Sequence, residues 1–422
     1  MVALISVVVL FTLSYTLALF AISRRRRPYL GASTEDLWFV FIVPCLNEEL
    51  VIGQSIDRLL ALPNPNFAVL VVDDGSDDRT SEIVESYDDP RILLLRRTPP
   101  EARQGKGEAL NAAFQRLRRA SAAAGRSSDD VIVAVIDADG RLDRNVLYEV
   151  APFFNDPDAG AVQIGVRMYN AGESVLARMQ DFEFVTFTEI FQRARQRVGS
   201  VGLGGNGQFA RLSALETLGD APWTQCLTED LDLGLRLLVG GWTNNFCPTT
   251  KVNQQAVTSI RRLVRQRSRW FQGHLQCWAR LPMVVRSSLP SRATADLVQH
   301  LLSPALVLVM TVPIVTFTVG MLAATVYSPS AVAHAWFAHG GLLVAVWYML
   351  SFGVAPFYGF CYWLREHSTS LPRAIALAHL YTLYSYLWFP AGWWAVWRIV
   401  TGRRGWAKTA RTPDAAIAHP SP

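Results

Sequence analysis

The stretch VIVAVIDADG (residues 131–140) decides the fold class of this chain. Its apolar part is an unbroken run rich in β-branched residues, which is typical of a strand that is buried on both faces. The run ends at Asp137, and Asp139 and Gly140 follow it, so the chain turns where two carboxylates meet the strand end. The stretch therefore predicts a buried strand with an acidic turn at its carboxyl end.

Three similar apolar runs lie upstream, separated by segments with helical spacing, over residues 38–43, 67–72 and 92–95. Buried strands that alternate with helices predict an α/β domain of the Rossmann-like type with a parallel sheet. Ligands of such sheets bind at the carboxyl ends of the strands. Asp73 and Asp74, which follow the second run, are therefore expected near Asp137 and Asp139.

The rest of the chain is too apolar for an ordinary soluble protein. Hydrophobic residues make up 50% of the 422 residues, and the mean hydropathy is +0.19. Arg24 to Arg27 follow the first apolar stretch directly, which predicts an uncleaved anchor with the following chain in the cytosol. Four stretches are long enough to cross a bilayer core of about 30 Å, and they cover residues 2–22, 297–326, 335–364 and 374–400.

The net charge and the cysteine spacing limit which binding partners and metal sites we expect. The net charge is +5, and arginines cluster beside apolar stretches, where anionic lipid headgroups attract them. No nucleic-acid-binding motif accompanies the charge, so no nucleic acid partner is expected. The five cysteines lack any C-x-x-C spacing, which supports neither a zinc site nor a disulfide framework, and we expect reduced thiols.

The acidic residues at the strand ends suit a nucleotide and a metal. Asp137 and Asp139 can face one hard cation, Mg²⁺ or Mn²⁺, that leaves room for phosphate oxygens, although an acidic surface turn is the ordinary alternative. Asp73 and Asp74 can accept hydrogen bonds from a base or a ribose. Lys106 lies between glycines at a predicted helix start and suits a phosphate, or is simply an exposed loop lysine.

Two further motifs suit transfer chemistry. Glu229 and Asp230 open a predicted helix, where acidic residues are common, and a carboxylate there can also take the proton of an attacking hydroxyl. Gln266, Arg269 and Trp270 lie in an amphipathic helix that suits a membrane interface. An aromatic face can stack on a sugar ring while a guanidinium holds a diphosphate.

Six motifs in this order resemble the membrane-bound family 2 glycosyltransferases of the cellulose, chitin and hyaluronan synthase type. The resemblance implies an A-type glycosyltransferase fold, inversion at the anomeric carbon, a nucleotide sugar donor that is a UDP-sugar, and Mg²⁺ or Mn²⁺ as cofactor. The motifs are Pro44-Cys45-Leu46-Asn47-Glu48, Asp73-Asp74-Gly75, Gly105-Lys106, Asp137-Ala138-Asp139, Thr228-Glu229-Asp230 and Gln266-x-x-Arg269-Trp270.

The resemblance also implies roles for single residues. Asp230 would be the catalytic base, with Glu229 as the next candidate, and Asp139 with Asp137 would hold the metal. Trp270, Gly205 and Asn206 would meet the acceptor. Leu46 stands where the family usually has a tyrosine, so base stacking by that loop is not expected. The nucleotide sugar would contact Pro44, Glu48, Asp73, Asp74, Lys106, Asp137, Gln266 and Arg269.

These patterns predict a multi-pass protein of the cell membrane with a cytosolic catalytic domain. Three full C-terminal spans would place Arg403 outside, against the positive-inside rule, so one is re-entrant or the count is too high. The expected segments are an anchor with its basic flank (1–30), the cytosolic glycosyltransferase domain (31–257), amphipathic interface helices (258–291), a C-terminal transmembrane region (296–402) and a basic, then disordered tail (403–422).

The complete Gln266-x-x-Arg269-Trp270 motif favours a growing β-linked polysaccharide as the acceptor. The alternative is a single sugar added to a membrane lipid, because four predicted spans are fewer than the long synthases carry. A membrane protein that binds nucleotide sugars without chemistry is a third class. It predicts the loss of at least one of Asp139, Asp230 and Trp270, and all three are present. No short motif encodes the sugar or the linkage.

Overall fold

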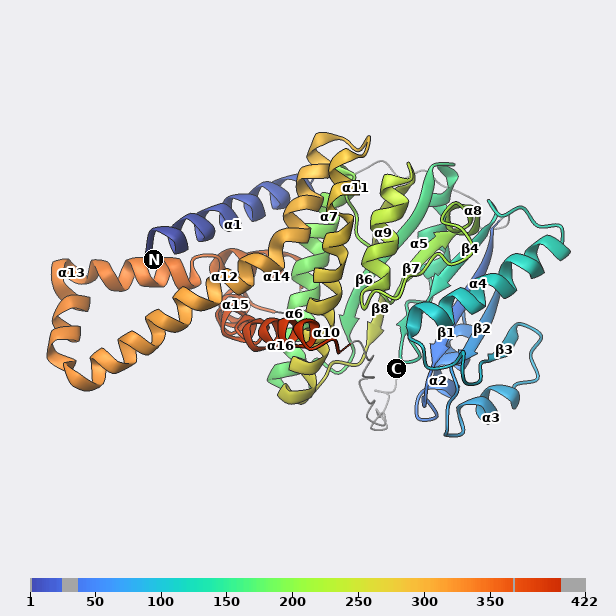
Figure 1. Cartoon of the computed structure of the whole chain (residues 1–422), viewed down its shortest axis with the longest axis horizontal. Coiled ribbons are helices and arrows are strands. Elements are labelled where there is room, and N and C mark those ends of the chain that lie inside the picture. Colours follow the sequence, from blue (N-terminus) through green and yellow to red (C-terminus); the bar gives the residue numbers. More distant parts are fainter. Residues whose placement is uncertain (1, 25–36, 367–368, 404–422) are drawn as a thin grey trace.

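The computed structural model describes residues 2–24, 37–366 and 369–403. A sheet domain forms one end of the molecule, apolar helices form the other, and α6 and α10 lie between them (Figure 1). Arg25 to Arg27 and the chain from residue 404 onward lie outside the described residues.

One eight-stranded sheet runs through the domain in the order β3-β2-β1-β4-β7-β6-β8-β5. The first four strands in this order pair in parallel, so their carboxyl ends lie along one edge, as predicted. They are the strands expected from the apolar runs, namely β1 (Trp38–Cys45), β2 (Phe67–Asp73), β3 (Ile92–Arg96) and β4 (Val131–Val135).

The other half of the sheet corrects the expectation of a wholly parallel sheet. β7 (Gln208–Arg211) runs antiparallel to β4 and to β6 (Ala159–Met168). β8 (Thr243–Gln254) is parallel to β6 and antiparallel to β5 (Arg141–Leu142). The sheet is therefore mixed. β7 and β8 do not stand out as apolar runs in the sequence, because β7 is short and most side chains of β8 are polar.

Helices cover both faces of the sheet. Along β1, Phe39 and Phe41 point into one core, and Val40 and Ile42 point into the other. The helices of this domain are α2 (Ile52–Leu60), α3 (Thr80–Glu85), α4 (Lys106–Ala123), α5 (Val146–Val150), η1 (Ala151–Asn155), α6 (Val175–Thr186), the π-helical η2 (Phe187–Gln192), α7 (Arg193–Val198), α8 (Leu212–Glu216) and α9 (Glu229–Val239).

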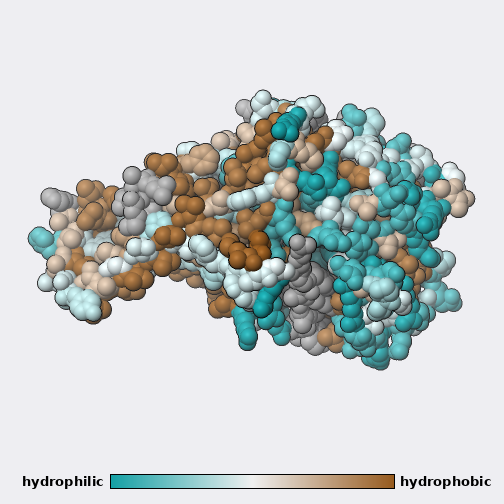
Figure 2. All heavy atoms as spheres, in the orientation of Figure 1, coloured by the Kyte–Doolittle hydropathy of each residue, from teal (hydrophilic) through white to brown (hydrophobic). Residues whose placement is uncertain are grey.

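Two helices within the described ranges are long and apolar enough to cross a membrane, α1 (Val2–Ser23) and α12 (Ser291–Tyr327). A third candidate is α13 (Pro329–Phe352), whose segments Pro329–Ala338 and Gly340–Phe352 meet at 88°. Figure 2 shows hydrophobic side chains over these helices and hydrophilic ones over the sheet domain. These helices point to membrane association.

The structure does not contain a full span over residues 374–400. This stretch forms α15 (Leu371–Ser385) and α16 (Trp388–Val400), each shorter than the roughly 20 residues that a span needs. α16 packs along α10 (Ile260–Gln276), where a Cβ at Gly392 would lie 3.0 Å from the Phe271 ring. The predicted stretch 335–364 is also interrupted, between α13 and α14 (Ala355–Arg365).

The end of α16 contacts α10. Gln272 on α10 donates a hydrogen bond through Nε2 to the carbonyl oxygen of Arg403, at 3.3 Å. The end of α16 therefore lies against α10, between the sheet domain and the apolar helices (Figure 1). The remaining helices, η3 (Cys277–Arg280) and α11 (Leu281–Arg286), connect α10 to α12.

A buried ion pair joins the apolar helices to the domain. Nε of Arg195 on α7 lies 2.9 Å from Oδ2 of Asp296 on α12. The same carboxylate accepts hydrogen bonds from Ser200 Oγ, at 2.8 Å, and from the hydroxyl of Tyr15 on α1. This network fixes α1 and α12 to α7 of the sheet domain.

Candidate active site

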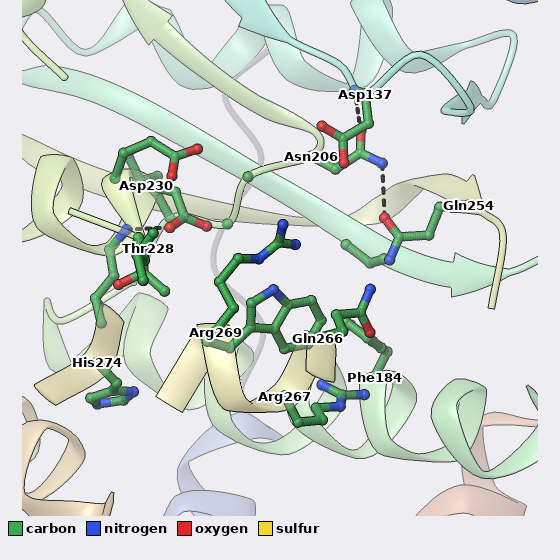
Figure 3. A pocket seen from close by; sticks show the side chains of 18 of the residues that line it. Asp137, Phe184, Asn206, Thr228, Asp230, Gln254, Gln266, Arg267, Arg269 and His274 are labelled. Carbon is green, nitrogen blue, oxygen red and sulfur yellow. Dashed lines mark hydrogen bonds between the residues drawn. The ribbon is translucent and has the colours of Figure 1, made fainter. Parts of the chain in front are cut away.

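A cavity of about 620 Å³ lies where the carboxyl ends of the parallel strands face α10. Figure 3 shows Asp230 on one side of it, Asp137 with Asn206 on the other, and Arg269 reaching between them. Of the predicted site residues, Asp73 and Asp139 do not line it. The others do, and they are Pro44, Glu48, Asp74, Lys106, Asp137, Gly205, Asn206, Glu229, Asp230, Gln266, Arg269 and Trp270.

Lys106 connects three segments of the site from the first turn of α4. Its Nζ lies 2.7 Å from Oδ1 of Asp137, 2.7 Å from the carbonyl oxygen of Gly205 and 3.9 Å from Oε1 of Glu229. Burial disfavours the charge, but the carboxylates of Asp137 and Glu229 outweigh it and raise the pKa of Lys106. Lys106 is therefore a fixed cation in the wall of the cavity.

Asp137 and Asp139 are held by Asn206, which the sequence predicted as an acceptor-binding residue, and by the end of β8, which the sequence did not mark. The backbone N–H of Asp137 donates to Oδ1 of Asn206, at 3.2 Å, and Nδ2 of Asn206 donates to Oε1 of Gln254, at 2.9 Å (Figure 3). The carboxylate of Asp139 is buried and accepts a hydrogen bond from the backbone N–H of Gln255, at 3.0 Å. The end of β8 therefore supports the acidic turn.

The donor set at this turn fits Mg²⁺ or Mn²⁺. Among the residues that the structure describes, no group of three or more His, Cys, Asp or Glu side chains is placed to hold an ion alone. Mg²⁺ is usually bound by one or two carboxylates together with substrate phosphates. Asp137, which lines the cavity, and the buried Asp139, two residues further along the same turn, carry hard oxygen atoms of this kind.

Glu229 and Asp230 occupy the first turn of α9, opposite Asp137. Burial raises the pKa of Glu229 to about 7, and burial also raises the pKa of Asp230. Oδ1 of Asp230 accepts a hydrogen bond from the backbone N–H of Leu231, at 2.8 Å. A Cβ at Gly205 would lie 3.4 Å from Oδ2 of Asp230, so the glycine-rich loop comes close to the predicted base.

The two aspartates at the end of β2 have different environments. Asp74 lines the cavity and pairs with Arg97, and burial raises the pKa of its carboxyl in spite of this arginine. Asp73 instead accepts hydrogen bonds from the backbone N–H of Ser76, at 2.8 Å, and from Ser81 Oγ. Asp74 therefore faces the position expected for the nucleotide, while Asp73 stabilises the loop behind it.

The sequence of this domain matches a known family over the whole site. The model described as glycosyltransferase like family 2 matches residues 37–273, which is more than half of the chain and includes every predicted site residue. The chain is a family 2 glycosyltransferase.

Two relatives of this glycosyltransferase are named for different products. Beta-monoglucosyldiacylglycerol synthase of Trichormus variabilis is 32% identical over 299 residues, which cover 68% of this chain and 60% of that protein. Poly-beta-1,6-N-acetyl-D-glucosamine synthase of Staphylococcus epidermidis is 27% identical over 236 residues, which cover 55% of this chain and 53% of that protein. The glycosyltransferase therefore spans less than two thirds of the length of either relative.

A solved structure confirms the predicted fold of the glycosyltransferase. A mannosyltransferase from Pyrobaculum calidifontis, in complex with GDP-Man and Mn²⁺, superposes with a TM-score of 0.59 at 19% identity. The superposition covers 91% of this chain and 99% of that one. It shows the A-type α/β fold with a mixed sheet and apolar helices.

Arg267 supports Trp270 in this glycosyltransferase, which the sequence did not predict. The Arg267 guanidinium lies 4.3 Å from the centre of the Trp270 ring. It is buried, and its Nη2 lies 2.5 Å from Oε2 of Glu183 on α6. Glu183 also accepts hydrogen bonds from the Tyr384 hydroxyl, at 3.0 Å, and from Nε1 of Trp388, at 3.2 Å. The α10 motif is therefore held by α6, α15 and α16.

The cavity of the glycosyltransferase continues into an apolar half. Phe184, Phe187 and Phe191 line it from α6 and η2, where the π-helical turn places the last two on the cavity side. No sequence pattern marks this half, because its residues come from six separate elements. The other lining residues there include Ser303, Pro304 and Val307 of α12, Tyr358 of α14, Tyr381 of α15 and Trp388 of α16.

Pro304 shapes the wall that α12 contributes. A proline lacks an N–H and cannot bond the carbonyl four residues earlier, which is that of His300. This oxygen instead accepts hydrogen bonds from Ser303 Oγ, at 2.7 Å, and from Nε2 of His274, at 3.0 Å. Burial lowers the pKa of His274 to about 4, so its ring is neutral and carries its proton on Nε2.

Proposed function

We propose that this glycosyltransferase transfers a single sugar from a UDP-sugar to a membrane lipid such as a diacylglycerol, with inversion at the anomeric carbon. The continuity of the cavity carries the proposal, because Asp230 and Pro304 of the candidate span α12 line the same space. A lipid acceptor can then bring its hydroxyl to the base while its acyl chains stay in the bilayer. The relative named for monoglucosyldiacylglycerol supports this acceptor class.

The donor occupies the half of the cavity at the strand ends. Asp74 accepts hydrogen bonds from the base or ribose, beside Pro44 and Glu48. Arg269 reaches between the two acidic sides (Figure 3), where its planar guanidinium can hold the diphosphate through two parallel hydrogen bonds. Lys106 adds a fixed positive charge on the side of Asp137.

Asp137 and Asp139 are the residues that would hold Mg²⁺ or Mn²⁺. An ion held there would supply positive charge that neutralises the leaving diphosphate. The backbone N–H of Gln255 donates to the carboxylate of Asp139, and Asn206, which is held by Gln254, accepts a hydrogen bond from the backbone N–H of Asp137. These bonds keep the acidic turn in place when the nucleotide binds or leaves.

Asp230 takes the proton from the acceptor hydroxyl as its oxygen attacks the anomeric carbon. Burial raises the pKa of Asp230, which makes the carboxylate a stronger base than a solvated one. Glu229, beside Lys106, keeps a pKa of about 7 and is the alternative base. Trp270 offers an aromatic face to the acceptor or to the sugar being transferred.

A growing polysaccharide is the second candidate acceptor. The complete motif from Gln266 to Trp270 and the relative named for poly-N-acetylglucosamine favour it. We prefer the lipid because the far half of the cavity is lined mainly by apolar and aromatic side chains of α12, α14, α15 and α16. A sugar chain would need polar partners along this path.

The decisive experiment identifies the product. The purified enzyme in lipid nanodiscs that contain diacylglycerol is incubated with radiolabelled UDP-sugars, one at a time, and with Mg²⁺ or Mn²⁺. We expect a chloroform-soluble product that carries one sugar, and none from the Asp230→Asn variant. Label retained as high-molecular-weight carbohydrate would overturn the lipid proposal in favour of the polysaccharide. Absence of transfer from every UDP-sugar would contradict both.

A further inference from the structure

Two thiols meet beside the loop that carries the proposed base. Sγ of Cys226 lies 3.7 Å from Sγ of Cys277, although the residues are 51 positions apart in the sequence. Neither residue lines the cavity, and the proposed transfer uses neither. Sequence spacing gave no sign of this pair, because it is formed only when α9 and α10 pack together.

The two cysteines belong to two segments that pack against each other beside the site. Cys226 lies in the loop before α9, and Cys277 follows α10 directly. The backbone N–H of Leu227 donates to Oε1 of Gln276, at 2.9 Å. A Cβ at Gly273 would lie 2.6 Å from the backbone nitrogen of Thr228, so the loop rests on the last turn of α10.

The surroundings give the two sulfurs different reactivity. The hydrogen bond with Cys277 is the main cause that lowers the pKa of Cys226, whereas the same bond and burial raise the pKa of Cys277. Cys226 is only half-buried and follows the exposed Gln225, while Cys277 is 1% exposed. Cys226 is therefore placed to react first with a small reagent, with Cys277 as its resolving partner.

We propose that Cys226 and Cys277 are an oxidative modification site, which a peroxide converts to a disulfide that slows sugar transfer. The Cys226 thiolate attacks one peroxide oxygen, so an S–O bond forms, the O–O bond breaks and water leaves after protonation. The sulfur of Cys277 then attacks the sulfenic acid, so the S–S bond forms and the S–O bond breaks. In sum, two thiols lose two electrons and two protons, and one hydrogen peroxide becomes two waters.

The disulfide acts on catalysis through the loop. A bonded S–S distance is about 2 Å, so the sulfurs must approach one another from their present 3.7 Å. Leu227 and Thr228, next along the chain, line the cavity and lead directly into Glu229 and Asp230. Because a displacement of about 1 Å at a reacting group can cost roughly 10²-fold in rate, we expect turnover to fall by about tenfold or more.

The test treats the full-length enzyme with hydrogen peroxide and combines peptide mapping with activity. Mass spectrometry without reductant is expected to find a peptide that links Cys226 to Cys277, and dithiothreitol is expected to remove the link and restore turnover. Cys226→Ser and Cys277→Ala each keep the untreated rate and lose most of the sensitivity to peroxide. Cys361→Ala, which changes a buried thiol on α14, is the matched control and stays sensitive.

Three results would overturn the proposal. They are an absence of the linked peptide when Cys226 is oxidised, a linked enzyme with an unchanged rate, and a Cys226→Ser variant as sensitive to peroxide as the wild type. The peptide map does not depend on sugar transfer. A failure of the proposed function, with no transfer before treatment, is therefore distinguishable from a failure of this inference.

Discussion

The guanidinium of Arg267 lies 4.3 Å from the centre of the Trp270 ring and pairs with Glu183. One face of the Trp270 ring is therefore in contact with a buried cation. A cation–π contact of this kind contributes about 1 to 2 kcal/mol when desolvated.

Arg267→Lys keeps a charge but loses the planar group that stacks on Trp270. We expect the KM for the acceptor to rise roughly tenfold, in line with about 1.4 kcal/mol, while the KM for the nucleotide sugar changes little. Initial rates at varied acceptor and saturating donor measure this. Arg265→Lys, an exposed position on the same helix, is the control. An altered donor KM with an unchanged acceptor KM would show that Arg267 serves the donor instead.

Asp230→Asn removes the proposed base but keeps the hydrogen bond from the Leu231 N–H. We expect turnover to fall by roughly 10² to 10⁴, the range for loss of a general base, while UDP still binds. Single-turnover rates and calorimetric titration with UDP separate the two effects. Asp220→Asn serves as the control, because the side chain of Asp220 is 82% exposed. Normal turnover of Asp230→Asn would move the search for the base to Glu229.

Asp139→Asn keeps an oxygen that can accept the hydrogen bond from Gln255 but removes a charge from the proposed metal site. We expect transfer to fall by about 10² or more, and EDTA to abolish it in the wild type. Mn²⁺ with UDP should raise the unfolding temperature of the wild type but not of this variant. An EDTA-treated enzyme that works at the full rate would refute a metal requirement.

Glu229→Gln tests the pKa of about 7 that burial gives Glu229. In the unfolded chain the pKa of a glutamate is about 4.3. The folded state therefore binds the proton more tightly, and the free energy of unfolding falls as the pH rises from about 4.3 to about 7. The glutamine variant has no such loss. Without metal and nucleotide, its unfolding temperature should exceed that of the wild type at pH 8, with the gain shrinking toward pH 4.5. An equal difference at all pH values would contradict the raised pKa.

Most residues that line the polar half of the cavity could be predicted from the sequence, because each lies in a short motif at the end of a strand or the start of a helix. Asp137 follows a strand that is recognisable from its apolar run, and Asp230 opens α9. The chemistry of such sites depends on a few residues close together in sequence.

The supporting residues could not be predicted, because their roles depend on tertiary contacts. Arg265 and Arg267 are two positions apart on α10, yet the first is exposed and the second is buried beside Glu183. The apolar stretch over residues 374–400 had the composition of a span. Its break at Tyr386–Leu387 and its contact with α10 became visible only in three dimensions.

The place of Pro304 in a candidate span has a kinetic consequence. A lipid that enters the cavity past α12 is found by diffusion in two dimensions, so its effective concentration is its mole fraction in the leaflet and not its amount per volume. Adding inert phospholipid at constant total acceptor would then slow the enzyme by surface dilution. A glycolipid product would stay in the bilayer, compete with fresh acceptor at the same entrance and inhibit more strongly as the leaflet fills with it.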